Sequence, residues 1–499
     1  MIAESPDARV TAPPTPAPEH AQPARHLARG ALAVLSTQPF TWAASLASVI
    51  LVPRVLGADG LGRFSIAWAI GTFAGGIAAT GLRTFVGRRV AAEPDSAGTY
   101  TWSAFAVSAG YFVVVAALVM AILALLRPAA VDLAIVALAL SGAFLWTIQG
   151  IVTAVLMSTG RHIRYALTSA SFSIVGTLGG LVALVAGAGA HGYGLGLLAG
   201  WAVMTGILVV GSGLPVTRSA VQVAYLREVL VGSVPFLGTN LALSVRGQTD
   251  VVITGLLLQP GIAGWLAAAY RITNVAVFIP SAIAAPLLPA LTSVRAAPGR
   301  YASILGTSVT TTLLLIVPIC GAIFSLAPVI PGLLGWPAEL DHAVPLMRIL
   351  AFQQVIVAVD MMLVTGYIAL GRERTWLRVT LIGAVFNPVV NLAAIPVAQA
   401  LTENGAIGAA IVEVATELLF MCAVLFLMPG GTLGRREVSA ALRVVVCGLG
   451  LVGVATVLLP AGPLVAGAAG GLTYVGLAIT LRLLRPQQLQ MLRMALRRT

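Results

Sequence analysis

The chain has 499 residues, of which 59% are hydrophobic and only 9% charged, and its formal net charge is +12. A soluble globular domain carries about 25% charged residues, so a chain this apolar is excluded from that class and must have lipid as its solvent. The apolar runs are long and uniform, which predicts membrane-spanning helices rather than barrel strands with their short alternating segments.

Residues 1–28 are rich in proline and alanine. This composition predicts a disordered cytoplasmic tail, because such a segment cannot bury enough apolar surface to fold.

Fourteen apolar segments follow, each long enough to span a membrane, so the sequence predicts an all-α polytopic membrane protein. In chain order they are 31–55, 61–86, 101–127, 131–157, 163–187, 190–212, 226–257, 262–292, 302–330, 342–370, 375–397, 404–428, 437–460 and 463–484. We expect two six-helix bundles, 29–217 and 218–430, followed by two extra helices and a basic cytoplasmic tail in 431–499.

The 29 basic residues are all arginine, and their positions predict the orientation of the chain. With the N-terminus in the cytoplasm, 23 arginines fall in cytoplasmic segments, whereas the outer loops hold only Arg54, Arg63 and Arg127. Arginine is enriched in cytoplasmic loops of membrane proteins. We therefore expect a multi-pass protein of the bacterial inner (cytoplasmic) membrane with both termini in the cytoplasm. The same distribution accounts for the basic net charge, so no nucleic-acid partner is expected.

The segments 56–64 and 258–266 are similar, and they align Gly62 with Gly264 at an offset of 202 residues. A repeat of six spans enters the membrane from the same side each time, so it is a parallel repeat. Two similar bundles facing each other would enclose a central cavity, and rocking one against the other would open that cavity to alternate sides.

The sequence contains no P-loop, no Cys/His metal cluster and no outer loop long enough to hold a domain. We therefore expect a transporter rather than an enzyme, with no catalytic residue, no cofactor and no metal. Cys320, Cys422 and Cys447 all lie in apolar runs, where packing is the expected role.

Two segments carry a family likeness. The first contains Asp250-Val-Val-Ile-Thr-Gly255, Ala263-Gly264-Trp265, Tyr270-Arg271-Ile272, Pro280, Pro286 and Pro289. The second contains Leu370-Gly371-Arg372, Asn387, Asn391, Ile395-Pro396, Asn404-Gly405-Ala406-Ile407-Gly408 and Glu417. Their order and spacing resemble helices seven, eight, eleven and twelve of the polysaccharide (oligosaccharide) flippase family, within the multidrug/oligosaccharidyl-lipid/polysaccharide exporter superfamily.

The resemblance implies a flippase that moves polyprenyl-diphosphate-linked oligosaccharide from the cytoplasmic to the outer leaflet by alternating access, for synthesis of surface polysaccharide such as lipopolysaccharide or exopolysaccharide. It implies a lipid-linked oligosaccharide and membrane lipid as ligands, a glycan polymerase and glycosyltransferases as partners, and a monomeric chain. A cation-coupled multidrug exporter and a lipid II flippase of the same superfamily remain alternatives. Segment 31–55 lacks the acidic residue that drug exporters usually carry there, which disfavours the first alternative.

Ionisable side chains inside a bilayer are costly, so each one is a candidate for function. We expect Arg246 and Arg271 to contact the substrate diphosphate, because guanidinium binds phosphate in a fork. Arg246 and Asp250 share a helix face at four residues' spacing, so a self-neutralised structural pair is the alternative. The neutral residues expected to line the cavity are Asn240, Gln38 and Gln149.

Four acidic residues lie inside the spans, and each has either a coupling role or a structural role: Asp250, Asp360, Glu413 and Glu417. Asp360 is a candidate for ion or proton coupling, with a hydrogen bond to a neighbouring helix as the alternative. Glu413 and Glu417 share one helix face, and hydrogen bonding between helices is their structural reading.

Overall fold

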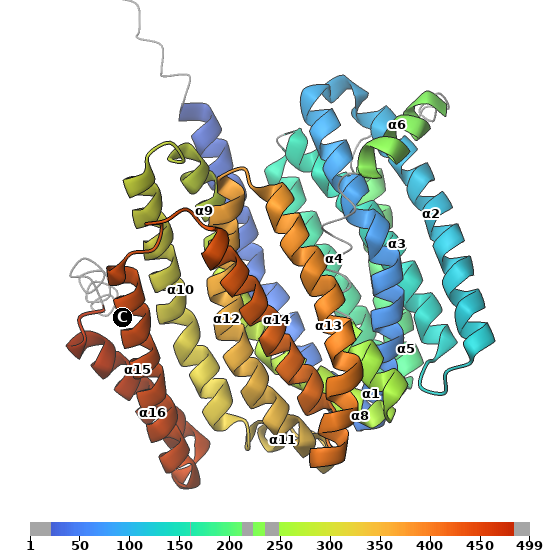
Figure 1. Ribbon diagram of the computed structural model, residues 1–499. Coiled ribbons are helices and arrows are strands. Elements are labelled where there is room, and N and C mark those ends of the chain that lie inside the picture. The colour runs from blue at the N-terminus through green and yellow to red at the C-terminus, as the bar shows by residue number, and fades with distance from the viewer. Residues whose placement is uncertain (1–20, 160, 212–222, 235–248, 484–499) are drawn as a thin grey trace, which may run out of the picture.

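The computed structural model describes residues 21–159, 161–211, 223–234 and 249–483. Within these ranges the chain is helical and contains no strand (Figure 1), which confirms the all-α fold class. The helices of the first part are α1 (Ala21–Ala92), η1 (Pro94–Ser96), α2 (Ala97–Leu126), α3 (Leu133–Ser158), α4 (His162–Val185), α5 (Gly189–Gly211) and α6 (Val223–Ser233). A helical segment at 249–257 leads into α8 (Pro260–Thr273), η4 (Asn274–Val277), α9 (Phe278–Ser293), α10 (Pro298–Leu326), α11 (Ile330–Leu333) and η5 (Ala338–Ala343). The chain continues through α12 (Val344–Ala369), α13 (Glu373–Thr402), α14 (Ala406–Leu427), α15 (Arg435–Leu458), η6 (Leu459–Ala461) and α16 (Pro463–Thr480).

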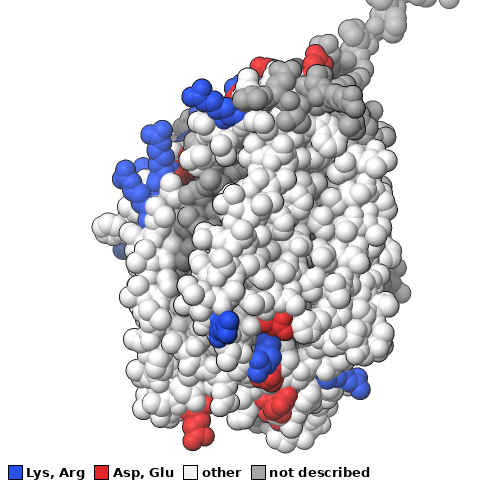
Figure 2. Space-filling model, turned by 90° about the vertical axis from the view of Figure 1, so that its right-hand side faces the viewer, with Lys and Arg blue, Asp and Glu red and all other residues white. Residues whose placement is uncertain are grey.

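The surface of the molecule matches a lipid environment. Among the described residues, 11 helical segments are long and apolar enough to cross a membrane. Large apolar side chains point outward: Phe426 is 89% exposed and Leu464 is 87% exposed. Figure 2 shows a broad uncharged band between charged side chains near the two ends of the molecule. The chain is therefore a multi-pass membrane protein, and the count of fourteen spans stays a prediction.

Helix α1 is a hairpin of two helical arms that meet at Gly57. Gly57 has φ 64° and ψ −172°, a backbone conformation that favours glycine and breaks the helix. The backbone N–H of Ala58, freed by this break, donates a hydrogen bond to Glu339 Oε1 on η5. The two arms run in opposite directions (Figure 1), as expected for the connection between the first two spans. The first arm includes residues 21–28. From their composition we had expected these residues to belong to a disordered tail.

Helix starts are set by local sequence signals. Asp132 caps α3 by accepting hydrogen bonds from the backbone N–H groups of Ala134 at 2.9 Å and Ile135 at 3.2 Å. Proline stands in the first turn of α8, α10 and α16, where its missing N–H has no helical partner to lose.

The helices form two groups, which we call the first helix group (α1–α6) and the second helix group (α8–α14). Helices α15 and α16 pack against each other and against α10, at the edge of the second group (Figure 1). The two groups meet where α1 packs on α8. The buried apolar core there includes Leu61 of α1, Leu266 of α8 and Leu340 of η5. We call this end of the molecule the Gly57 end. The boundary predicted between the two six-helix bundles, at 217/218, lies outside the described residues.

Candidate functional site: a central cavity between the two helix groups

A cavity of about 720 Å³ lies between the two helix groups. The first group contributes residues of α1 and α5, and the second contributes residues of α8, η4, α12 and α14. The polar and aromatic side chains that line this central cavity are Phe64, Ser65, Trp68, Tyr193, Trp201, Tyr270, Arg271, Asn274, Gln353, Gln354 and Glu413. Ligand pockets in proteins measure roughly 300–1,000 Å³, so the cavity can hold a ligand of substantial size.

Arg271 lines the central cavity from the last turn of α8. Its Nη1 donates a hydrogen bond across the group boundary to Ser48 Oγ of α1, at 3.1 Å. Ser48 Oγ also lies 3.2 Å from the Tyr193 hydroxyl of α5. Among the described residues, the hydrogen bond of Arg271 goes to a neutral hydroxyl at the wall of the central cavity.

Amide side chains form a second polar element of the wall, on the second helix group. Gln354 of α12 donates from Nε2 to Asn274 Oδ1 of η4, at 3.2 Å. Gln354 also donates to Gln353 Oε1 at 3.2 Å. Both glutamines are more than nine-tenths buried. This chain of amides holds η4 against α12, directly beyond the helix that carries Arg271.

Glu413 belongs both to the cavity wall and to a polar network between helices. Asn387 of α13 donates to Glu413 Oε1 at 3.1 Å, and Thr249 donates to Asn387 Oδ1 at 3.2 Å. Asn391 also donates to Asn387 Oδ1, at 3.0 Å. The network supports the structural reading of Glu413, because buried polar groups between membrane helices stabilise packing when they are hydrogen-bonded.

The other acidic residues predicted for the site are buried and do not belong to the cavity lining. Asp250 is 1% exposed and accepts a hydrogen bond from the Tyr270 hydroxyl, next to Arg271 in the chain. Asp360 on α12 is 7% exposed and Glu417 on α14 is 2% exposed. Neither Asp360 nor Glu417 is among the residues that line the cavity.

The remaining predicted lining residues are not brought to the cavity by the described structure. Asn240, Arg246 and the side chain of Gln38 lie outside the described residues. Gln149 is 7% exposed within α3 and does not line the central cavity. A polar residue in a span can face a neighbouring helix as readily as a cavity, which is why its residue type alone did not place it.

Aromatic side chains that the sequence did not single out form one wall of the cavity. Phe64 and Trp68 of α1 stack with ring centroids 5.1 Å apart. Tyr193 lies 5.0 Å from Phe64, and Trp201 lies 5.8 Å from Trp68, between ring centroids. In a sequence, tryptophan and tyrosine in membrane helices indicate the lipid interface, so nothing in the pattern marked these four as cavity residues.

The backbones of the two helix groups touch at Gly62 of α1 and Gly264 of α8. A Cβ on Gly62 would overlap the Pro260 carbonyl oxygen and lie 3.0 Å from the Gly264 nitrogen. A Cβ on Gly264 would overlap the Ala58 carbonyl oxygen. The two glycines that the internal similarity aligned therefore pack against each other, backbone to backbone. This contact closes the Gly57 end of the boundary between the groups.

The fold is shared with solved membrane transporters. A lipid II flippase MurJ in an inward closed conformation superposes with a TM-score of 0.75 at 15% identity, covering 90% of this chain and 99% of that chain. An inward-facing multidrug resistance MATE family transporter of the MOP superfamily has a TM-score of 0.61 at 17% identity, covering 82% and 98%. A second structure of a transporter of that family, outward-facing, gives a TM-score of 0.53 at 19% identity and covers 84% and 97%. These likenesses show that the chain has the fold of these transporters.

Residues 51–337 match the model of the polysaccharide biosynthesis protein family, and the chain belongs to this family. The match confirms the family resemblance of the sequence. No curated protein sequence matches the chain.

Proposed function

We propose that this protein flips polyprenyl-diphosphate-linked oligosaccharide from the cytoplasmic to the outer leaflet by alternating access, for the synthesis of surface polysaccharide. The observation that carries the proposal is Arg271, a cationic side chain in a cavity shared by both helix groups. Membership of the polysaccharide biosynthesis protein family supports it independently. This function requires glycosyltransferases that supply the substrate and a glycan polymerase that consumes it.

The diphosphate is the part of this substrate that a bilayer excludes most strongly. An ionised group in hydrocarbon costs several kcal/mol unless it is paired or hydrated. Arg271 can pair with it in a fork of two hydrogen bonds. Ser48 and Tyr193 are in the same hydrogen-bonded chain as Arg271 and add hydroxyl groups of the first helix group. Substrate bound there would contact both groups, as transport by rocking requires.

The sugar part of the substrate fits the remaining walls. The apolar faces of sugar rings stack on aromatic side chains, and Trp68 and Trp201 present such faces. Sugar hydroxyls find amide partners in Asn274, Gln353 and Gln354 on the opposite group. The polyprenyl chain needs no protein cavity, since it is soluble in the surrounding lipid.

The closed Gly57 end gives this proposal a direction. From the arginine distribution we expect the Gly57 end on the outer side of the membrane. With that end closed by the Gly62–Gly264 contact, substrate would enter the cavity from the cytoplasmic side. Rocking that separates this contact would then expose the cavity to the outer leaflet.

A genetic complementation test addresses the function directly. In a strain lacking the gene, lipid-linked glycan intermediates should accumulate on the cytoplasmic leaflet and surface glycan should be lost. Wild-type protein should restore both, whereas Arg271→Ala, inserted at wild-type level, should restore neither. Normal surface glycan in the deletion strain would contradict the proposal.

Arg348 provides a matched control for Arg271. It is also an arginine of a membrane helix, but its Nε donates to the Phe324 carbonyl oxygen at 3.3 Å and it lies outside the central cavity. Arg348→Ala should therefore restore surface glycan. Equal loss with both variants would show that removal of any intramembrane arginine disables the chain, and would remove Arg271 from the proposed site.

A cation-coupled multidrug exporter is the second candidate, and one observation favours it. Trp68, Trp201 and Glu413 share the cavity, and aromatic faces with a carboxylate attract organic cations. This function predicts drug sensitivity and normal surface glycan in the deletion strain. A lipid II flippase would use the same diphosphate chemistry, and it predicts arrested peptidoglycan synthesis instead of lost surface glycan.

A further inference from the structure

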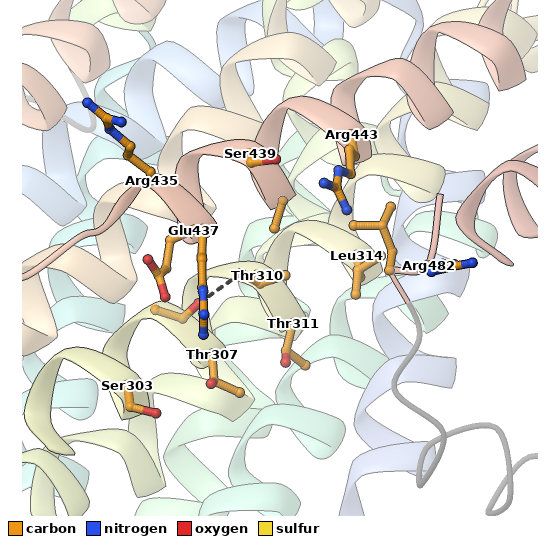
Figure 3. A pocket seen from close by; sticks show the side chains of 14 residues that line it. Ser303, Thr307, Thr310, Thr311, Leu314, Arg435, Glu437, Ser439, Arg443 and Arg482 are labelled. Atoms are coloured by element: carbon orange, nitrogen blue, oxygen red, sulfur yellow. Dashed lines mark hydrogen bonds between the residues drawn. The ribbon is translucent and has the colours of Figure 1, made fainter. Parts of the chain in front are cut away.

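A second cavity, of about 500 Å³, lies at the opposite end of the membrane helices from Gly57. It is bounded by the start of α10, the start of α15 and the residues that follow α16, as Figure 3 shows. We call it the basic pocket. It shares no lining residue with the central cavity, so the proposed transport function leaves it unexplained.

The basic pocket carries a concentrated positive charge. Four arginines line it: Arg435, Arg436, Arg443 and Arg482. The acidic residue in its lining is Glu437, whose Oε2 accepts a hydrogen bond from the Gly434 N–H at 2.9 Å and so caps α15. Four positive charges against one negative charge strongly favour an anionic ligand.

Hydroxyl groups cover the side of the pocket formed by α10. Ser303, Thr307, Thr310 and Thr311 line it, and Figure 3 shows them across the pocket from the arginines of α15. Gly306 lies between them, where a Cβ would come 2.5 Å from Glu437 Cγ. Arginine and hydroxyl groups facing each other across one cavity are the donor set that binds phosphate oxygens.

Apolar stripes lead from the pocket into the membrane region on both bounding helices. On α15, Leu442, Val446 and Leu449 follow Arg435 and Ser439 along one face, and they are 62%, 51% and 67% exposed. On α10, Leu315 and Ile319 follow Thr311 at four-residue intervals, with 47% and 36% exposure. The pocket is thus polar at the membrane end and continues as an apolar surface toward the bilayer centre.

We propose that the basic pocket binds the phosphate headgroup of an anionic phospholipid, with its acyl chains along the apolar stripes of α10 and α15. Basic pockets between membrane helices on the cytoplasmic side bind anionic headgroups in this way. The alternative source of the same chemistry is free phosphate, which would use the arginines but not the stripes. A lipid bound in this pocket would stabilise the packing of α15 and α16 against α10. The thermal stability of the protein would therefore depend on anionic lipid.

The test uses the full-length protein, delipidated in a neutral detergent, with phosphatidylglycerol, phosphatidylcholine and inorganic phosphate as probes. Native mass spectrometry should detect bound phosphatidylglycerol, and thermal unfolding should shift upward with it. Each arginine near an anionic headgroup is worth about 1 kcal/mol, so Arg435→Gln/Arg443→Gln/Arg482→Gln should weaken phosphatidylglycerol binding at least about tenfold. Phosphatidylcholine and inorganic phosphate should give neither bound species nor stabilisation.

A charge-matched control separates the pocket from general basicity. Arg295, Arg300 and Arg374 are exposed arginines at the same end of the helices and outside the pocket. Their combined change to glutamine should leave phosphatidylglycerol binding within about twofold of wild type. Equal weakening in both triple variants would overturn the proposal. Equal stabilisation by inorganic phosphate would overturn the assignment to lipid.

A second variant keeps the test valid if the first does not fold. Arg443 Nη1 donates to the Leu481 carbonyl oxygen at 3.3 Å and helps to end α16, so its loss carries a structural cost. Arg435→Gln/Arg482→Gln retains that bond and should still weaken phosphatidylglycerol binding. Unchanged binding in this folded double variant would contradict the proposed site.

Discussion

Gly62 and Gly264 face each other where α1 crosses α8, so closely that a Cβ on Gly264 would lie 3.1 Å from the Gly62 nitrogen. Side chains are absent on both sides of this crossing, which lets the two backbones touch. Small residues allow membrane helices to approach in this way. The contact joins the two helix groups at the Gly57 end, so its geometry controls how they can move relative to each other.

Gly264→Ala should destabilise this contact. The added methyl group would overlap the Ala58 carbonyl oxygen and force the helices apart, and overpacking of this kind costs about 1–3 kcal/mol. We expect a lower midpoint of thermal unfolding in detergent and weaker restoration of surface glycan. Gly110→Ala in α2 is the control, because a Cβ there meets nothing within 4 Å. If the two variants unfold alike, the contact does not stabilise the closed end.

Arg271→Lys should retain less function than wild type but more than Arg271→Ala. Lysine keeps the positive charge and loses the planar fork that binds a diphosphate through two hydrogen bonds. Surface glycan, measured at equal protein level in the deletion strain, should therefore rank wild type, Arg271→Lys, Arg271→Ala. Full activity of Arg271→Lys would show that charge alone suffices at this position.

Trp68→Ala should reduce transport, and Trp68→Phe should retain most of it. Trp68 lines the central cavity and stacks on Phe64, so a sugar ring would lose its aromatic platform only in the alanine variant. The measurement is surface glycan at equal protein level. Equal activity of the two variants would remove Trp68 from substrate contact.

Trp201 is less suitable for such a test, because its side chain also packs against other helices of the first helix group. Its ring is parallel to that of Phe172, with centroids 5.7 Å apart, and it lies against Gly176 of α4. Loss of this side chain would mix effects on folding and on binding.

Glu413→Gln should preserve folding, because the amide oxygen can still accept the hydrogen bond from Asn387. Glu413→Leu should lower stability by about 1–3 kcal/mol, since it removes the acceptor of one N–H of the buried Asn387 amide, while the amide nitrogen keeps its hydrogen bond to Thr416 Oγ1. Thermal unfolding distinguishes the two. Glu413→Gln protein that folds normally but has lost transport would favour a coupling role for the carboxylate instead.

The sequence predicted the parts of this molecule that depend on bulk physical properties. The membrane class followed from composition, since a chain with so few charges needs lipid around it. The similarity of two segments aligned Gly62 with Gly264, but only the structure shows that their backbones touch. Arg271 was singled out because an arginine within a span is costly; the structure places it in the wall of the central cavity, and its contact with substrate stays a prediction.

The features that were missed depend on tertiary packing. Phe64, Trp68, Tyr193 and Trp201 come from two helices, and no spacing within one helix reveals that they share a wall. Gln353 and Gln354 are a polar pair in the middle of an apolar span, which is a signal in the sequence. They carry no charge, however, and the cost of burial in a bilayer singles out ionisable groups first. Gln149 was chosen by residue type alone, and it is not among the residues that line the central cavity.

The aromatic side chains of the cavity wall also provide an intrinsic fluorescence probe. Two of the protein's eight tryptophans, Trp68 and Trp201, line the central cavity and lie 5.8 Å apart between ring centroids. A ligand that enters the cavity displaces water from both indole rings, so their fluorescence emission should shift to shorter wavelength. Titration of the unlabelled protein, with the Trp68→Phe variant as reference, would then follow occupancy of the cavity without any added dye.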